Sequence, residues 1–195
     1  MKREAGPVKY MGVQNTVRLI NEIGLDTVLR ELAQYIEDDF KRWEEFDMSA
    51  RYASHSPDGV VELMPISDGK QFTFKYVNGH PKNFNNGLMT VVAFGILSDV
   101  KTGYPQLLAE MTLGTALRTA ATSALAAKYL APKHAKSMAI IGQGSQSEFQ
   151  ASAFKALLGI NDFRLYDIAP ASTQKFRKNL AGQNLRIKVA PTAEA

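Results

Sequence analysis

A glycine-rich turn in the second half of the chain carries the clearest chemical signal. The segment from Ser137 to Asp167 contains an apolar run, a turn with Gly142 and Gly144, a helical pattern, and a second apolar run that ends on Asp167. Gly142 permits the tight turn, and Gly144 lets the backbone approach a pyrophosphate, which the free N–H groups of the following helix attract. A carboxylate about 20 residues past such a turn can accept hydrogen bonds from ribose hydroxyls. The pattern predicts a dinucleotide-binding βαβ unit.

The motif departs from the usual fingerprint at its third glycine position, which holds Ser147. A G-x-G sequence is weak evidence when it stands alone, and an ordinary βαβ turn is the alternative. The strand–turn–helix–strand–acid order favours nucleotide binding. Asp167 further predicts a preference for NAD over NADP, because a carboxylate suits a ribose 2′-hydroxyl and repels a 2′-phosphate.

The elements before the turn indicate a different architecture. Residues 1–20 are expected to be a lead-in with a strand near Val8 to Met11, and a core-facing amphipathic helix is expected from Leu25, with an apolar face that extends to Phe46. Short turn signals separate the strand-like runs, so no crossover helix fits between them and an antiparallel sheet is expected. These runs are Arg51 to Ser56, Val60 to Met64, Gln71 to Val77, Thr90 to Leu97 and Pro105 to Met111, with a tight hairpin at Asp99 to Tyr104.

An alanine-rich helix from Thr112 to Leu130, ended by Pro132, is expected to join this sheet to the nucleotide unit. A helix at Pro170 to Leu180 and a strand at Leu185 to Val189 follow Asp167. The predicted fold class is α/β: an α+β domain over residues 1–131, then a Rossmann-type domain over residues 132–195. Such a domain usually has about six parallel strands, and the pattern contains half of them, so we expect the second domain to be incomplete.

Three cations are candidate ligands for an anionic substrate group. Arg51 and Lys75 lie in strand-like runs, and Lys75 shares its face with Thr73 and Val77. Arg118 is the one cation between Thr112 and Ala127, so it needs an acidic partner or an anionic ligand if it is buried. Together the three would suit an amino-acid carboxylate. Simple solvent exposure is the alternative for each.

Composition excludes several other classes. The net charge is +4 and the pI is about 9.2, but the basic residues are scattered, so nucleic-acid binding is not expected. The sequence has no cysteine, no long apolar run and no signal-peptide pattern, which favours a cytoplasmic protein without a membrane partner. The histidines match no metal-ligand spacing, and no serine has the turn of a nucleophile elbow; the residues considered are His55, His80, His134, Ser54, Ser56 and Ser123.

Several longer strings resemble the ornithine cyclodeaminase and mu-crystallin family, and bacterial ornithine cyclodeaminases in particular. The resemblance covers nearly the whole chain from the amphipathic helix onward. Its carriers are Asp39-Phe40-Lys41-Arg42-Trp43, Ser49-Ala50-Arg51, Val61-Glu62-Leu63-Met64-Pro65, the segment FKYVNGHP from Phe74, the segment TALRTAA from Thr115, and the segment GQGSQSEFQ from Gly142.

The resemblance implies a homodimeric lyase of ornithine catabolism that converts L-ornithine to L-proline and ammonia, with NAD as a recycled hydride carrier. It places the substrate carboxylate on Arg51, Lys75 and Arg118. It implies no catalytic acid or base within this chain, because the family's acid/base carboxylate is expected beyond Ala195. The 195-residue chain by itself is therefore expected to be a fragment with negligible cyclodeaminase activity. The positions that it assigns to NAD contact, together with the glycines of the turn, are Thr90, Arg118, Gly142, Gly144, Ser145, Gln146 and Asp167.

Two other readings remain open. A related ketimine reductase or an amino-acid dehydrogenase such as alanine dehydrogenase would consume reduced or oxidised cofactor stoichiometrically, whereas a cyclodeaminase recycles it. A non-catalytic, crystallin-like binding protein would turn over neither substrate nor cofactor.

Overall fold

The computed structural model describes residues 6–194, and the polar start of the chain, residues 1–5, lies outside them. The chain divides into two compact units. The first contains the described residues up to Glu22 together with Asp39–Thr115. The second contains Ile23–Asp38 together with the described residues from Ala116 onward. A functional domain boundary between residues 131 and 132 stays a prediction.

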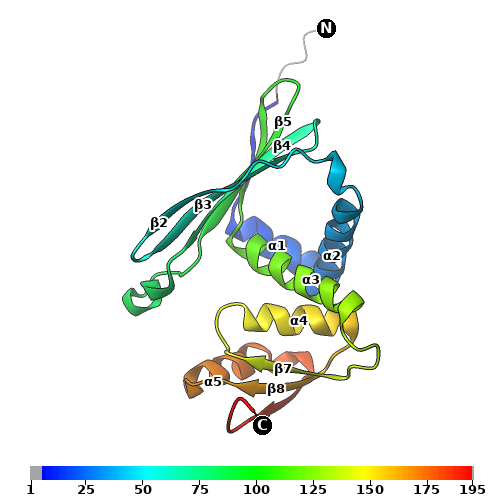
Figure 1. Cartoon of the computed structure of the whole chain (residues 1–195), viewed down its shortest axis with the longest axis vertical. Coiled ribbons are helices and arrows are strands. Elements are labelled where there is room, and N and C mark those ends of the chain that lie inside the picture. Colours follow the sequence, from blue (N-terminus) through cyan, green and yellow to red (C-terminus); the bar gives the residue numbers. More distant parts are fainter. Residues whose placement is uncertain (1–5, 195) are drawn as a thin grey trace. The chain divides into compact units, whose positions relative to one another are not determined.

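The first unit is built on a six-stranded sheet in the order β1-β6-β5-β4-β3-β2 (Figure 1). The pairs from β2 to β6 are antiparallel, as the short turns predict. The hairpin between β5 and β6 is closed by the N–H of Asp99, which donates to the carbonyl of Tyr104 at 3.0 Å. The strands are β1 (Lys9–Met11), β2 (Tyr52–Ser56), β3 (Gly59–Ser67), β4 (Gln71–Gly79), β5 (Ala93–Asp99) and β6 (Pro105–Glu110).

The expected N-terminal lead-in holds more structure than the sequence suggested. β1 pairs in parallel with β6, with Tyr10 opposite Leu108, so the sheet is not wholly antiparallel. Helix α1 (Val13–Ile23) follows at once. Its start is fixed by Gly12, whose N–H donates to the Asn15 side chain at 3.1 Å. The i, i+4, i+7 spacing of Val13, Val17 and Ile20 was the available signal for this helix.

Helix α2 (Leu25–Lys41) forms where the apolar periodicity predicts it, and it buries Leu29 and Ala33. The predicted core-facing side was wrong at the last turn of this helix and beyond it. Phe40 and the following 3₁₀ turn η1 (Trp43–Glu45) do not enter a core: the Phe40 and Trp43 rings are about half exposed and stack on each other with centroids 5.5 Å apart. Stacking shields two large apolar faces where no core is available to cover them.

Helix α3 (Thr112–Leu130) has the predicted bounds. A Glu110 carboxylate oxygen accepts the N–H groups of Thr112 and Leu113, two of the donors left free at a helix start. Within the second unit α3 buries Ala120, Ala121 and Ala124 completely, which agrees with the close approach that small side chains permit.

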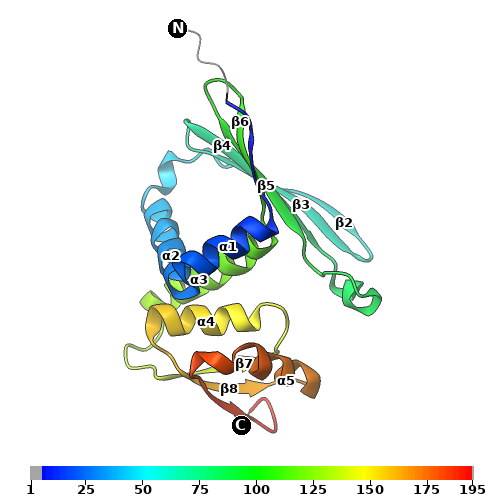
Figure 2. The ribbon, with the colours of Figure 1, turned by 180° about the vertical axis from the view of Figure 1, so that it is seen from behind.

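The second unit contains a three-stranded parallel sheet in the order β7-β8-β9 (Figure 2). Helix α4 joins β7 to β8, and helix α5 with the 3₁₀ turn η3 joins β8 to β9. The elements are β7 (Ser137–Ile141), α4 (Ser147–Leu158), β8 (Asp162–Tyr166), α5 (Pro170–Asn179), η3 (Ala181–Gln183) and β9 (Arg186–Val189). Gly159 ends α4 in the left-handed conformation, at φ 69°, as its position predicts.

The core of this sheet gathers around Phe163 and Leu165 of β8, both fully buried. Ala151 of α4 and Phe176 of α5 pack into the same cluster. Because both helices pack on the central strand, they hold the carboxyl ends of β7 and β8 in fixed positions. Ligands of open parallel sheets bind at this edge.

Candidate functional site

The glycine turn adopts the geometry that its residue types require. Gly142 has φ 88°, a left-handed conformation that other residues rarely adopt, and its N–H donates to the Tyr166 carbonyl at 2.8 Å. Gly144 does not have the positive φ of Gly142, and a Cβ built there would meet nothing within 4 Å. Its missing side chain therefore leaves open space beside the backbone, where a ligand can approach.

Gln143, between the two glycines, is fully buried and was missed by the sequence analysis. Its Nε2 donates to the carbonyls of Ile140 at 2.8 Å and Tyr166 at 3.0 Å. Its Oε1 accepts the Thr173 hydroxyl at 2.8 Å. One side chain thus joins the ends of β7 and β8 to helix α5 and fixes the turn from inside.

Asp167 lies immediately beyond β8 and is brought to the turn. Its Oδ2 accepts the Gln143 N–H at 2.5 Å, and its Oδ1 accepts the Ala169 N–H at 2.8 Å. These two bonds, with a smaller contribution from the charge of Lys175, lower the pKa of Asp167 below its ordinary value despite some desolvation. A carboxylate oxygen has lone pairs for further donors, so Asp167 can accept ribose hydroxyls while it holds the turn.

Ser147, in place of the third glycine, is accommodated as the first residue of α4. Its buried hydroxyl donates to the Gly144 carbonyl at 2.8 Å and lies 2.9 Å from the Glu148 carboxylate. Gln146 occupies the N-cap position without a side-chain capping bond, and its Oε1 is buried without a hydrogen-bond partner among the described residues. Ser145 is exposed at the outside of the turn.

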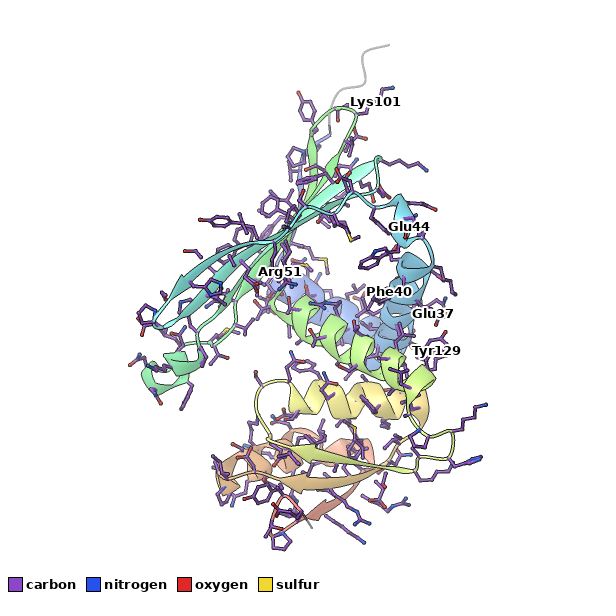
Figure 3. All side chains as sticks on the ribbon, viewed as in Figure 1. Glu37, Phe40, Glu44, Arg51, Lys101 and Tyr129 are labelled. Carbon is purple, nitrogen blue, oxygen red and sulfur yellow. The ribbon has the colours of Figure 1, made fainter. Side chains whose placement is uncertain are left out.

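Arg51 and Lys75 share one face of the six-stranded sheet. Arg51 directly precedes Tyr52, the first residue of β2, and Tyr52 pairs with Leu63. The same register continued by one residue sets Arg51 opposite Met64, which pairs with Lys75. Residues opposite each other on paired strands project to the same face. The register therefore brings these two cations to one side of β3, and Figure 3 labels Arg51 at this sheet.

Both cations have polar neighbours on this face. Arg51 is 59% exposed and forms an ion pair with Glu62, which is 20% exposed, at 3.0 Å. The Lys75 ammonium lies 3.4 Å from the Thr115 hydroxyl in the first turn of α3. The sequence analysis missed Glu62, although its alternation with Met64 along β3 was the available signal.

The other two assigned positions lie elsewhere. Thr90 precedes β5 and was wrongly placed in a strand; its carbonyl accepts the His80 N–H at 2.9 Å. Asn78 holds the residues just before β5 in place, because its Oδ1 accepts the Val92 N–H at 2.6 Å. Arg118 belongs to the second unit, and its side chain is exposed with no ion pair to any residue between 6 and 194. Within this range Arg118 therefore has no acidic partner.

The described part of the chain holds no group of three or more His, Cys, Asp or Glu residues arranged to bind a metal ion. None of its described helices has the length and apolar character needed to cross a membrane.

Comparison with known proteins identifies the family. The family model described as the ornithine cyclodeaminase/mu-crystallin family matches residues 13–195. An ornithine cyclodeaminase of Brucella abortus is 57% identical over 187 residues, which are 96% of this chain and 52% of that protein. The chain therefore spans about half the length of this curated relative.

Solved structures agree in fold. A lysine cyclodeaminase, studied for recognition of L-lysine, L-ornithine and L-2,4-diaminobutyric acid, superposes with a TM-score of 0.89 at 25% identity, over 97% of this chain and 57% of its own. An archaeal alanine dehydrogenase dimer with bound NAD gives 0.80 at 27% identity, over 96% and 57%. The mixed α/β architecture, an antiparallel-rich sheet followed by a Rossmann-type parallel sheet, is thus confirmed. The chain belongs to the ornithine cyclodeaminase/mu-crystallin family.

Proposed function

We propose that this chain supplies the amino-acid-binding and NAD-binding parts of an ornithine cyclodeaminase, which converts L-ornithine to L-proline and ammonia. The observation that carries the proposal is the glycine turn joined directly to Asp167, in a chain 57% identical to an ornithine cyclodeaminase.

The turn fits the adenosine diphosphate half of NAD. Open space beside Gly144 admits a diphosphate, and the N-terminus of α4 offers N–H donors and the positive end of its dipole. Asp167 supplies an acceptor for ribose hydroxyls, and the unpartnered Oε1 of Gln146 supplies another acceptor at the same helix start. When bound, NAD supplies the hydride acceptor and donor of the reaction. We also assign Thr90, Arg118 and Ser145 to cofactor contact, on the family relationship.

The cationic sheet face fits an amino-acid carboxylate. Arg51 can make bidentate contacts, and Lys75 adds a second positive charge from the next strand but one. Glu62 holds Arg51 at 3.0 Å and fixes the direction of its guanidinium group. Arg118 is proposed as a third carboxylate contact. Residues that hold the carboxylate orient the α-carbon, and such orientation supplies much of the rate acceleration in enzymes.

We also propose that the protein acts as a homodimer in the cytoplasm. A dimeric relative of the same fold supports the homodimer. The absence of cysteine supports the cytoplasmic location.

The test has two measurements. Calorimetric titration of the chain with NAD is expected to show binding, which Asp167→Ala should weaken at least tenfold. Incubation of a version extended to the length of the curated relatives with L-ornithine and a catalytic amount of NAD is expected to yield proline and ammonia without net NADH. Stoichiometric consumption of cofactor would instead identify an amino-acid dehydrogenase or ketimine reductase, which the alanine dehydrogenase relative makes the second candidate.

A further inference from the structure

The start of α4 carries a negative charge at the place where the proposed function needs room for a diphosphate. Glu148 stands in the first turn of this helix, and its side chain is only 13% exposed. Acidic residues favour a helix N-terminus when it has no ligand. Here, however, an uncompensated carboxylate would repel the diphosphate that the same N-terminus is proposed to bind, because the two like charges would lie within one Debye length.

Lys175, from α5, provides the compensation. Its ammonium lies 3.1 Å from Glu148 Oε1, and it also donates to the Gly144 carbonyl at 3.2 Å. The Asn179 amide, a neutral donor, donates to the same Oε1 at 3.0 Å. Oε2 lies 3.4 Å from the Lys175 ammonium and 2.9 Å from the neutral Ser147 hydroxyl. Lys175 is therefore the one cation paired with this carboxylate among the described residues.

We propose that Lys175 is a positioning residue of the dinucleotide site: it neutralises Glu148 and holds the Gly144 carbonyl, so that the turn and the α4 N-terminus accept a diphosphate. The proposal rests on the proposed function. A purely structural ion pair between α4 and α5 would have the same geometry. Its loss, however, would affect the binding of charged and uncharged ligands equally. The charge of the ligand therefore separates the two explanations.

The experiment is calorimetric titration with three probes: NAD, ADP and the uncharged adenosine. The variants are Lys175→Met, Glu148→Gln and the double variant, with Lys175→Arg as the conservative rescue. Lys178→Met, which removes another exposed cation from the same helix, is the matched control.

Lys175→Met is expected to weaken NAD and ADP binding about fivefold to tenfold. This is the effect of one uncompensated carboxylate about 8 Å from the diphosphate in a partly solvated site. The affinity for adenosine should change by less than about twofold. The double variant should recover most of the lost affinity, because no uncompensated carboxylate remains. Lys175→Arg and Lys178→Met should bind all three probes as the original chain does. Raised salt should reduce the effect of Lys175→Met.

Equal weakening of adenosine and ADP binding, or no recovery in the double variant, would overturn this role of Lys175 but would not affect the proposed function, because the original chain would still bind NAD. An unfolded Lys175→Met chain would show that the pair is structural and would also overturn it. If the original chain binds none of the three probes, the proposed function fails and this inference fails with it.

Discussion

The backbone N–H of Gln143 donates to the Asp167 carboxylate at 2.5 Å, across 24 residues of sequence. This bond joins the glycine turn after β7 to the acid after β8, so the two halves of the nucleotide motif form one rigid edge. Asp167 therefore has a structural role before any ligand arrives, and its substitution tests both roles at once.

Asp167 is expected to set the cofactor preference. The chain should bind NAD more tightly than NADP, and Asp167→Asn should reduce the ratio of the two affinities at least tenfold, because the carboxylate that repels a 2′-phosphate is gone. Comparative calorimetric titration measures the ratio. Asp162→Asn, at the other end of β8, is the control and should leave it unchanged. Equal or tighter NADP binding by the original chain would contradict the assignment.

Gln143 is expected to be a stability residue. Gln143→Leu keeps the volume but removes the side-chain hydrogen bonds to Ile140, Tyr166 and Thr173. Buried groups left without partners cost about 1–3 kcal/mol each, so the loss of these three partners should lower the free energy of unfolding by roughly 3–5 kcal/mol. Urea denaturation measures it. Gln174→Leu, an exposed glutamine on α5, should change the value by less than about 0.5 kcal/mol.

Arg118 is expected to act on binding more than on folding. Its side chain is exposed and has no acidic partner among the described residues, so Arg118→Ala should shift the melting temperature by less than about 3 °C. Ornithine affinity should fall about tenfold or more, as for the loss of a charged hydrogen bond to a carboxylate. Lys128→Ala is the control on the same helix: Lys128 pairs with Glu37 at 3.0 Å, and the Tyr129 hydroxyl donates to the same carboxylate at 2.7 Å. Figure 3 labels Glu37 and Tyr129. A large loss of stability with unchanged ornithine affinity would show that Arg118 is structural.

Asp68 is expected to make the stability of the first unit depend on pH in the acidic range. The N–H groups of Gln71 and Lys70, followed by Arg42 at 3.0 Å, lower the pKa of Asp68 to about 2. Because the pKa of Asp68 is lower in the folded chain than its ordinary value of 3.8, the ionised carboxylate stabilises the fold at pH values above 3.8. This stabilisation is lost as the pH falls through the folded-state pKa, about 2. Asp68→Asn should therefore cost about 1 kcal/mol at pH 7 and progressively less between about pH 4 and about pH 2.

Urea denaturation from pH 7 to pH 2 follows this difference between Asp68→Asn and the original chain. Asp58→Asn, in the exposed turn between β2 and β3, is the control. A difference that stays constant over the whole range would show that the effect of Asp68 is not electrostatic.

Local sequence determined most of the elements. The bounds of α3, the end of α4 at Gly159 and the glycine turn followed by Asp167 could all be predicted, because helical periodicity, helix ends and turn glycines depend on residues close in sequence. The family could also be identified from strings of residues alone. The β1–β6 pairing could not, since its partners are separated by almost the whole first unit.

Tertiary structure decided how the site is assembled. The sequence offered Arg51 and Lys75 as separate cations, but only the strand register places them on one face and sets Glu62 beside Arg51. Burial of Gln143 and the pairing of Lys175 with Glu148 depend on how α5 packs beside α4. Side-chain hydrogen bonds between elements have no periodic signal in the sequence, because they form only after the hydrophobic core has fixed the distance between those elements.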